Sequence, residues 1–318
     1  MPPALIGDIG ATNARFALLE NGKPQAVKVL HVDDFPTLRA AIDSYLADAA
    51  PSAAPRRAAL AVAGPVTGDR FSLTNNHWSF SIEELKGGLG LDRLELVNDF
   101  AALALAAPRF GPQDRRQVGD GNAVSDAPIA VIGPGTGLGV ASVVPARCDG
   151  KTRWVPLPGE GGHATLPTVG EREMAIVEFL YGSGYDHVSA ERLVCGEGLV
   201  NLCRAIAALD GKRSEDLTPP DVTDRAAHGD AVAHEAVAIF CAMLGTVAGN
   251  LALTVGARGG VYVAGGIVPK LGQIFDRSDF RRRFVSKGRM QRYVETIPTF
   301  VVTNELPAFI GLAAALEA

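Results

Sequence analysis

The chain has few cysteines and no excess of basic residues, and both features narrow the possible function. Its four cysteines among 318 residues include no C-x-x-C pair, so neither a zinc ribbon nor a thiol redox motif is indicated. We expect reduced thiols in a cytoplasmic protein. The 30 lysines and arginines are outnumbered by 35 aspartates and glutamates, for a net charge of −5. This balance argues against a nucleic-acid partner, which needs a basic face, and favours a small-molecule substrate.

The sequence also has few features of a secreted or membrane-spanning protein. Residues 1–6 have no basic region and no long apolar run, so no signal peptide is expected. Only residues 236–257 form an uncharged stretch near the length of about 20 apolar residues that a spanning helix needs. Gly245, Gly249 and Asn250 interrupt this stretch, which favours a helix buried inside the protein and no membrane partner.

Two familiar phosphate-binding signatures are missing, and two other glycine-rich turns are present. No stretch fits G-x-x-x-x-G-K-[ST], and residues 133–139 fail the dinucleotide pattern G-x-G-x-x-G because their glycines recur at every second position. We call residues 7–15 (GDIGATNAR) the first glycine turn and residues 133–139 (GPGTGLG) the second glycine turn. Each lies between two apolar runs predicted as strands. These runs are residues 4–9, 15–19, 128–132 and 140–144.

A strand–turn–strand segment with free backbone N–H groups is one way for a chain to bind phosphate. The alternative for either turn alone is an ordinary tight hairpin whose glycines adopt positive φ. The occurrence of two such turns, together with the isolated carboxylate described next, favours phosphate binding.

Asn98 and Asp99 directly follow a predicted strand, residues 94–97, and precede an alanine-rich helix that runs to Ala107, where Pro108 stops it. Ligand sites of α/β proteins lie at such strand ends, where a carboxylate can act as a general base. Alternatively, Asp99 only caps the helix, a function that Asn98 can perform equally well. Two phosphate-binding turns and one carboxylate indicate phosphoryl transfer to an alcohol.

Strands alternate with helices along the chain, which predicts the α/β class. Residues 108–126 are the most polar and turn-rich break, and we expect a hinge there. The remaining predicted helices are residues 35–50, 171–181, 198–208, 221–227, 230–255 and 307–316. The remaining predicted strands are residues 27–30, 58–63, 261–264 and 300–302.

Several motifs resemble those of the actin/Hsp70/sugar-kinase superfamily. They are the first glycine turn, Asn98-Asp99-Phe100, residues 135–139 of the second glycine turn, and residues 264–267 (AGGI). Within this superfamily, residues 158–163 (PGEGGH) and 187–192 (HVSAER) closely resemble the bacterial ATP-dependent glucokinase family, and the match runs from about residue 5 to the C-terminus.

The resemblance implies a two-domain actin-like ATPase (ribonuclease H-like) fold with a cleft between two lobes. The smaller α/β lobe would be residues 1–108, completed by a C-terminal helix in residues 304–318. The larger α/β lobe would be residues 109–303. Relatives also imply a homodimer.

The implied activity is transfer of the γ-phosphate of ATP to the 6-hydroxyl of glucose, the entry to glycolysis. Asp99 would be the general base. Glucose hydroxyls would bind Asn98, Glu160, His163 and Glu191, because each carboxylate can accept hydrogen bonds from two adjacent hydroxyls. The alternatives are a solvated loop carboxylate for Glu160, a surface or satisfied histidine for His163, and an ordinary acidic residue of a first helical turn for Glu191.

ATP and Mg²⁺ are the implied cofactors. Asp8 would hold Mg²⁺ through water, as this ion commonly meets proteins. Neither glycine turn contains lysine, so Mg²⁺ and backbone dipoles would balance the phosphate charge. The ATP-binding residues would be Gly7, Asp8, Ile9, Gly10, Ala11, Thr12, Asn13, Gly135, Thr136, Gly137, Gly265 and Gly266.

Two further possibilities stay open at this point. The enzyme could phosphorylate another hexose, such as mannose, fructose or an amino sugar. A sugar-sensing regulator on the same scaffold would carry an added DNA-binding segment, for which the first glycine turn, beginning at Gly7, leaves no room. A structural zinc is not expected either, because no tight cysteine cluster follows His163.

Overall fold

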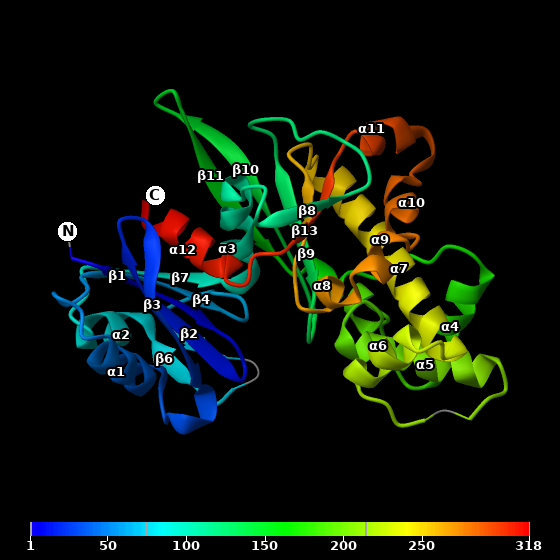
Figure 1. The fold of residues 1–318 in the computed structure, drawn as a ribbon, viewed down its shortest axis with the longest axis horizontal. Coiled ribbons are helices and arrows are strands. Elements are labelled where there is room, and N and C mark those ends of the chain that lie inside the picture. Colours follow the sequence, from blue (N-terminus) through cyan, green and yellow to red (C-terminus); the bar gives the residue numbers. More distant parts are fainter. Residues whose placement is uncertain (1, 74–75, 214, 318) are drawn as a thin grey trace. The chain divides into compact units, whose positions relative to one another are not determined.

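The computed structural model describes residues 2–73, 76–213 and 215–317, which form two compact units (Figure 1). The first unit comprises Met1–Phe110, Ala146–Pro158 and Glu305–Ala318, and the second comprises Gly111–Pro145 and Gly159–Asn304. Strands and helices alternate along the chain, which confirms the predicted α/β class.

The first sheet has five strands in the order β3-β2-β1-β4-β7. Strand β1 pairs antiparallel with β2 and parallel with β4, and β4 pairs parallel with β7. Between β2 and β3, Asn21 and Gly22 both adopt positive φ, 50° and 75°, as a tight hairpin turn requires. The strands are β1 (Ala4–Ile9), β2 (Asn13–Glu20), β3 (Lys23–His31), β4 (Arg57–Val62) and β7 (Arg93–Asn98).

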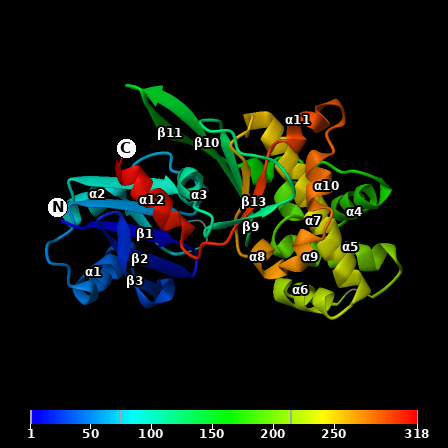
Figure 2. The ribbon, with the colours of Figure 1, turned by 45° about the horizontal axis from the view of Figure 1, so that its top comes forward.

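Helices cover both faces of this sheet (Figure 2). Alternate residues of β1 point to opposite sides, so Leu5 packs with α1 (Leu38–Ala49) and α2 (Ile82–Gly88), whereas Ile6 packs with α3 (Asp99–Ala106) and α12 (Pro307–Glu317). A Cβ on Gly311 of α12 would lie 1.8 Å from the Ala102 carbonyl oxygen of α3. The last helix of the chain therefore completes the core of the first unit.

The second sheet has the order β11-β10-β9-β12-β13-β8. Strand β9 pairs antiparallel with β10 and parallel with β12, and β12 pairs parallel with β13. Five of its strands thus repeat the order of the first sheet, and the predicted repetition of strand, glycine turn and strand is confirmed. The strands are β8 (Arg115–Val118), β9 (Ile129–Pro134), β10 (Leu138–Cys148), β11 (Lys151–Gly159), β12 (Val261–Val263) and β13 (Thr299–Val302).

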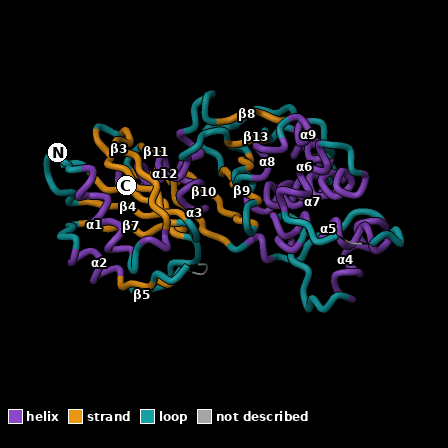
Figure 3. The backbone as a smooth tube through the Cα atoms, turned by 60° about the horizontal axis from the view of Figure 1, so that its bottom comes forward, coloured by secondary structure: helices purple, strands orange, loops and turns teal. Residues whose placement is uncertain are grey.

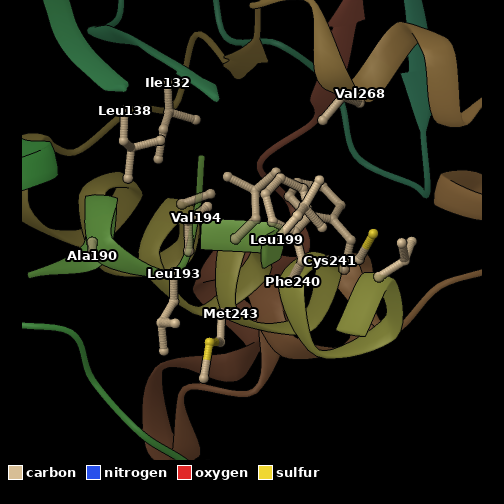
Figure 4. Close-up of a cluster of buried hydrophobic side chains, with 14 of the residues drawn as sticks. Ile132, Leu138, Ala190, Leu193, Val194, Leu199, Phe240, Cys241, Met243 and Val268 are labelled. Carbon is tan, nitrogen blue, oxygen red and sulfur yellow. The ribbon is translucent and has the colours of Figure 1, made fainter. Parts of the chain in front are cut away.

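The second unit also contains a layer of helices around α7 (Ala231–Val255), which Figure 3 shows beside α4, α5 and α6. Helix α7 is long and apolar enough to cross a membrane, but 72% of its most apolar window is buried inside the protein. Phe240, Cys241 and Met243 of α7 belong to the large core that also contains Ile132 of β9 and Leu138 of β10 (Figure 4). The prediction of a buried helix is confirmed.

The remaining elements are short or lie around α7. The helices are α4 (Glu171–Gly182), α5 (Gly196–Leu209), α6 (Pro219–Ala227), α8 (Ile267–Leu271), α9 (Gln273–Asp276), α10 (Phe280–Val285) and α11 (Gln291–Glu295). Strands β5 (Arg70–Ser72) and β6 (Ser79–Ser81) pair in a small sheet of the first unit. Single 3₁₀ turns occur at Val32–Asp34, Ala107–Arg109, Gly161–His163, Ala190–Arg192 and Gly288–Met290.

Two details differ from the sequence-based prediction. Pro108 does not end the helical conformation, because a 3₁₀ turn at Ala107–Arg109 continues α3. Proline is tolerated there because it lies in the first turn. The break at residues 108–126 also contains β8, which pairs antiparallel with β13. Its sequence, RRQV, has a single apolar residue, so pairing with a distant strand, and not local pattern, creates this strand.

Candidate functional site

Part of the first glycine turn is structural and part is exposed. Gly7 and Ile9 lie within β1 and are buried, whereas residues 10–13 are exposed or half-buried. A Cβ on Gly7 would lie 2.8 Å from a Leu60 methyl carbon and 2.9 Å from the Phe16 ring. Glycine at position 7 therefore allows the sheet to pack, and residues 10–13 are the part of the turn that can meet a ligand.

Two hydrogen bonds fix this exposed part from outside. The Asn76 side-chain amide donates to the Gly10 carbonyl oxygen at 3.3 Å, and the Val32 N–H donates to the Thr12 carbonyl oxygen at 2.9 Å. Both bonds use carbonyl oxygens and occupy no N–H donor of the turn. No sequence motif pointed to Asn76, because 66 positions separate it from Gly10.

Asp8 lies at the end of β1, directly before the exposed part of the turn. Its side chain is 27% exposed, and its carboxylate oxygen lies 3.5 Å from the Arg15 guanidinium on β2. Burial raises the pKa of Asp8 above its ordinary value, and the charge of Arg15 lowers it in part. A carboxylate that has lost water and has only a distant cation beside it suits a hydrated Mg²⁺ ion.

A metal site built entirely from protein ligands does not accompany Asp8. Within residues 2–73, 76–213 and 215–317, no group of three or more His, Cys, Asp or Glu side chains is arranged to hold a metal ion.

The end of β7 presents Asn98 and Asp99. Asn98 is the N-cap of α3, and its side-chain oxygen accepts the Ala101 N–H at 3.1 Å while its amide donates to the Gly64 carbonyl oxygen at 3.2 Å. Asp99 is the first residue of the helix, and its Oδ1 accepts the Phe100 N–H at 2.9 Å. Asn98 thus performs the capping function, and the helix dipole stabilises negative charge on Asp99.

The second glycine turn is closed by a hydrogen bond from the Gly135 N–H to the Gly137 carbonyl oxygen at 2.8 Å. The Gly135 carbonyl oxygen accepts the N–H of Gly196, the first residue of α5, at 2.8 Å. The Gly196 N–H is therefore paired, and the Gly198 N–H donates to Cys195 Sγ at 3.3 Å. Thr136, at the tip of the turn, is exposed. The turn therefore offers the Thr136 hydroxyl to an anion.

Gly265 lies against the same turn. Its φ is +82°, and a Cβ there would lie 2.3 Å from the Pro134 carbonyl oxygen, whereas nothing lies within 4 Å of a Cβ on Gly266. Only glycine fits position 265, because the backbone conformation and the close approach both exclude a side chain. The structure thus brings the predicted glycine pair Gly265-Gly266 to the second glycine turn.

Glu160, His163 and Glu191 lie together in the second unit. Residues 164–166 run beside residues 188–190, with hydrogen bonds from the Leu166 N–H to the Val188 carbonyl oxygen and from the Ala190 N–H to the Ala164 carbonyl oxygen. This pairing places His163 Nδ1 3.9 Å from Glu191 Oε1. The His163 N–H donates to the Glu160 carbonyl oxygen at 3.0 Å.

This cluster adjoins the second glycine turn. Glu191 Oε2 accepts the Leu138 N–H at 2.7 Å. A Cβ on Gly162 would lie 2.0 Å from the Leu138 carbonyl oxygen, so residues 160–163 lie closely on the start of β10. The side chains of Glu160 and His163 are exposed, and that of Glu191 is 29% exposed. Asn98 and Asp99 belong to the first unit, with the first glycine turn.

Comparisons with known proteins show the family to which the chain belongs. A family model described as Glucokinase matches residues 5–318. A glucokinase of Nitrobacter hamburgensis is 50% identical over 310 residues, which are 97% of this chain and 95% of that protein. A solved glucokinase from an Antarctic psychrotroph is 36% identical with a TM-score of 0.90, and the match covers 100% of this chain and 99% of that one.

A more distant structure supports the same fold. A Balamuthia mandrillaris glucokinase, solved in complex with glucose, is 22% identical with a TM-score of 0.78, and the match covers 99% of this chain and 93% of that one. These likenesses confirm the actin-like sugar-kinase fold that the motifs implied.

Proposed function

Because the chain belongs to the glucokinase family, we propose that it transfers the γ-phosphate of ATP to the 6-hydroxyl of glucose, giving glucose 6-phosphate and ADP. The observation that carries this proposal is the cluster of Glu160, His163 and Glu191 beside the second glycine turn. Hydrogen-bond acceptors suited to a polyol lie there next to a turn suited to phosphate.

Asp99 is the general base of the proposed reaction. Its carboxylate accepts the proton of the 6-hydroxyl while that oxygen attacks the γ-phosphorus in line, and the bond from the γ-phosphorus to the β-phosphate oxygen breaks. Its position at the end of a parallel strand and at the start of α3 supports this role. Asn98 has one further amide N–H that can meet a sugar hydroxyl, because its cap uses the oxygen and Gly64 takes only one N–H.

The sugar hydroxyls bind the side chains of Glu160, His163 and Glu191. A sugar that lacks or inverts a hydroxyl leaves one of these side chains without its hydrogen bond. Membership of the family favours glucose over mannose, fructose and amino sugars, and the experiment below compares these sugars directly.

The phosphates of ATP bind residues 10–13 of the first glycine turn and residues 135–137 of the second. Thr12, Asn13 and Thr136 supply side-chain donors beside the backbone N–H groups, and Gly265 and Gly266 let the nucleoside approach the backbone closely. Bound Mg²⁺ supplies positive charge that neither turn supplies through lysine. Asp8 would hold this ion through water.

A coupled assay of ADP release with glucose, mannose, fructose and glucosamine, with and without Mg²⁺, tests the proposal. We expect the highest kcat/KM with glucose, and no turnover without Mg²⁺. Another hexose with a higher kcat/KM would replace glucose as the substrate. No turnover with any of them would contradict the proposed reaction and would favour a sugar-sensing protein.

Three further properties belong to this proposal. The two units act as the small and the large domain: the proposed base and Asn98 belong to the first unit, and the other proposed sugar ligands belong to the second. The enzyme is cytoplasmic, in keeping with the buried free thiols of Cys195, Cys203 and Cys241. It is a homodimer, which light scattering coupled to size-exclusion chromatography tests.

A further inference from the structure

Glu191 divides its carboxylate between two partners. Oε2 accepts the N–H of Leu138 at 2.7 Å, and Oε1 faces His163 Nδ1 at 3.9 Å. Leu138 is only 4% exposed, so water cannot readily replace the carboxylate as the partner of its N–H. A buried N–H without an acceptor is costly, and a charged acceptor makes the bond stronger. The carboxylate is therefore held in place by the second glycine turn.

Gly137 shows that the contact is close enough to restrict the sequence. A Cβ at this position would lie 2.4 Å from Glu191 Oε2. The φ of Gly137 is not positive, so the backbone conformation at this position does not require glycine. A side chain at position 137 would therefore have to move the Glu191 carboxylate.

Gly182, the last residue of α4, provides the contrast. Its φ also lies outside the positive region, and nothing lies within 4 Å of a Cβ built there. An added methyl group at position 182 therefore has room, and one at position 137 displaces the Glu191 carboxylate or the turn.

We infer that Glu191 couples the binding of sugar to the binding of nucleotide. The inference rests on the proposed function. Through Oε2 the residue is fixed to the turn that binds the phosphates, and through Oε1 it presents an acceptor to a sugar hydroxyl beside His163. A nucleotide that orders the turn also orders this acceptor, and by thermodynamic reciprocity a bound sugar strengthens nucleotide binding by the same factor. Glu191 is thus a positioning residue for the turn as well as a sugar ligand.

Isothermal titration calorimetry on the full chain tests the inference. Glucose is titrated into wild type, Gly137→Ala, Gly182→Ala and Glu191→Gln, each with and without saturating Mg²⁺ and a non-hydrolysable ATP analogue. In wild type we expect the analogue to tighten glucose binding by about fivefold or more, the lower end of typical coupling. Without nucleotide, Gly137→Ala should weaken glucose binding by about tenfold or more, as expected when a charged hydrogen bond is lost.

The matched variants decide between coupling and simple ligation. Gly182→Ala should keep the nucleotide-free glucose affinity within about twofold, as for a substitution without steric conflict, whereas Gly137→Ala and Glu191→Gln should both lose the coupling. A Gly137→Ala variant that binds glucose like Gly182→Ala overturns the inference. So does a Glu191→Gln variant that binds glucose weakly with its coupling intact, because Glu191 would then be a sugar ligand only.

Two controls keep this result separate from others. Thermal unfolding followed by circular dichroism verifies that each variant is folded, and Glu191→Gln, which preserves the shape of the side chain, tests the inference even where Gly137→Ala does not fold. Failure of the wild type to phosphorylate any sugar contradicts the proposed function. A wild type that phosphorylates glucose while its variants show no change in coupling contradicts only the inference.

Discussion

The two units share a strand order but place different side chains at the ends of their strands. In the first unit, the turn after β1 is preceded by Asp8, and β7 ends at Asn98 and Asp99. In the second unit, the turn after β9 carries no carboxylate of its own and receives Glu191 from elsewhere in the chain. The same topology thus provides the proposed base, the proposed metal ligand and Asn98 in one unit, and the other proposed sugar ligands in the second.

The two glycine turns also differ in how they are held. The first is held through its carbonyl oxygens by Asn76 and Val32, neither of which we propose to touch a substrate. The second is held through the Gly135 carbonyl oxygen by Gly196, and also through the Leu138 N–H by Glu191, a proposed sugar ligand. We therefore expect substitutions near the first turn to affect chemistry or nucleotide alone, and substitutions near the second to affect sugar binding as well.

The largest expected effect is that of Asp99→Asn in the first unit. Loss of a general base lowers kcat by about 10²- to 10⁴-fold, and glucose binding measured by calorimetry should remain within about threefold, because uncharged Asn keeps the size of the side chain. Asp43→Asn, on the exposed surface of α1, is the matched control and should retain wild-type kcat. A near-normal kcat for Asp99→Asn would remove Asp99 from the mechanism.

Glu160→Gln tests the corresponding assignment in the second unit. We expect the KM for glucose to rise by about 10- to 100-fold, the effect of losing one charged hydrogen bond, with little change in the KM for ATP. Steady-state kinetics with each substrate varied in turn measures both. Glu178→Gln, exposed on α4, is the control. Equal increases in both KM values would place Glu160 outside the sugar site.

Asp8→Asn should separate metal binding from stability. Activity at limiting Mg²⁺ should fall by about tenfold, the lower end for groups that hold a metal indirectly, and added Mg²⁺ should restore part of it.

The raised pKa of Asp8 means that the folded state favours the neutral carboxyl. The stabilisation that Asp8 contributes is therefore present below the ordinary pKa of 3.8 and is lost as pH rises through the folded pKa.

Removal of the charge should therefore raise the melting temperature of Asp8→Asn relative to wild type at pH 7, and the difference should shrink as pH falls toward 4. Thermal unfolding across this pH range measures it. An Asp8→Asn variant whose melting temperature lies below that of wild type by the same amount at pH 7 and at pH 4 would contradict this reasoning.

The smallest expected effect concerns how the two units bury charge. Among the described residues, only the second unit buries an ion pair, in which the Arg283 guanidinium donates to the Glu173 carboxylate at 2.6 Å. Lys287 lies beside it and donates to the Thr246 carbonyl oxygen at 3.1 Å. Burial, together with the positive charge of Arg283, lowers the pKa of Lys287 to about 8.

The unfolded chain therefore binds more protons than the folded chain between the folded pKa of about 8 and the ordinary value of 10.5, and Lys287 makes the free energy of unfolding rise with pH across this window. Lys287→Met removes this contribution. The free energy of unfolding of Lys287→Met minus that of wild type, measured in urea, should fall between pH 8 and 10. The exposed Lys270→Met is the control. A difference that is constant with pH would show that Lys287 has an ordinary pKa.

Local sequence patterns predicted much of the fold because the elements concerned carry their own signals. The strands around each glycine turn are apolar runs bounded by glycine, and α7 is one long apolar stretch that glycine and asparagine interrupt. The exceptions, such as β8, owe their conformation to a partner far along the chain. Arg115–Val118 has no strand pattern of its own and forms a strand because β13 is beside it.

The candidate site was predictable as a set of residues but not as an arrangement. The family resemblance pointed to Glu160, His163 and Glu191 as sugar ligands. The structure brings these three residues together, and their binding of sugar stays a prediction. Nothing in the sequence indicated that Glu191 accepts the Leu138 N–H or that Asn76 holds Gly10, since 53 and 66 positions separate these pairs. Such contacts depend on tertiary folding, which spacing along the chain does not reveal.

The position of α12 has a consequence for how the protein is made. This helix fills one face of the first sheet, where Phe309 and Leu312 pack with Ile6 and Ala59, yet it is synthesised roughly 200 residues after the main part of the first unit. At a translation speed of about 5–20 residues per second, the apolar face of that sheet waits on the order of 10 to 40 seconds on the ribosome without its cover. During this interval the nascent chain exposes that apolar face, and the first unit reaches its native core only after α12 has been synthesised.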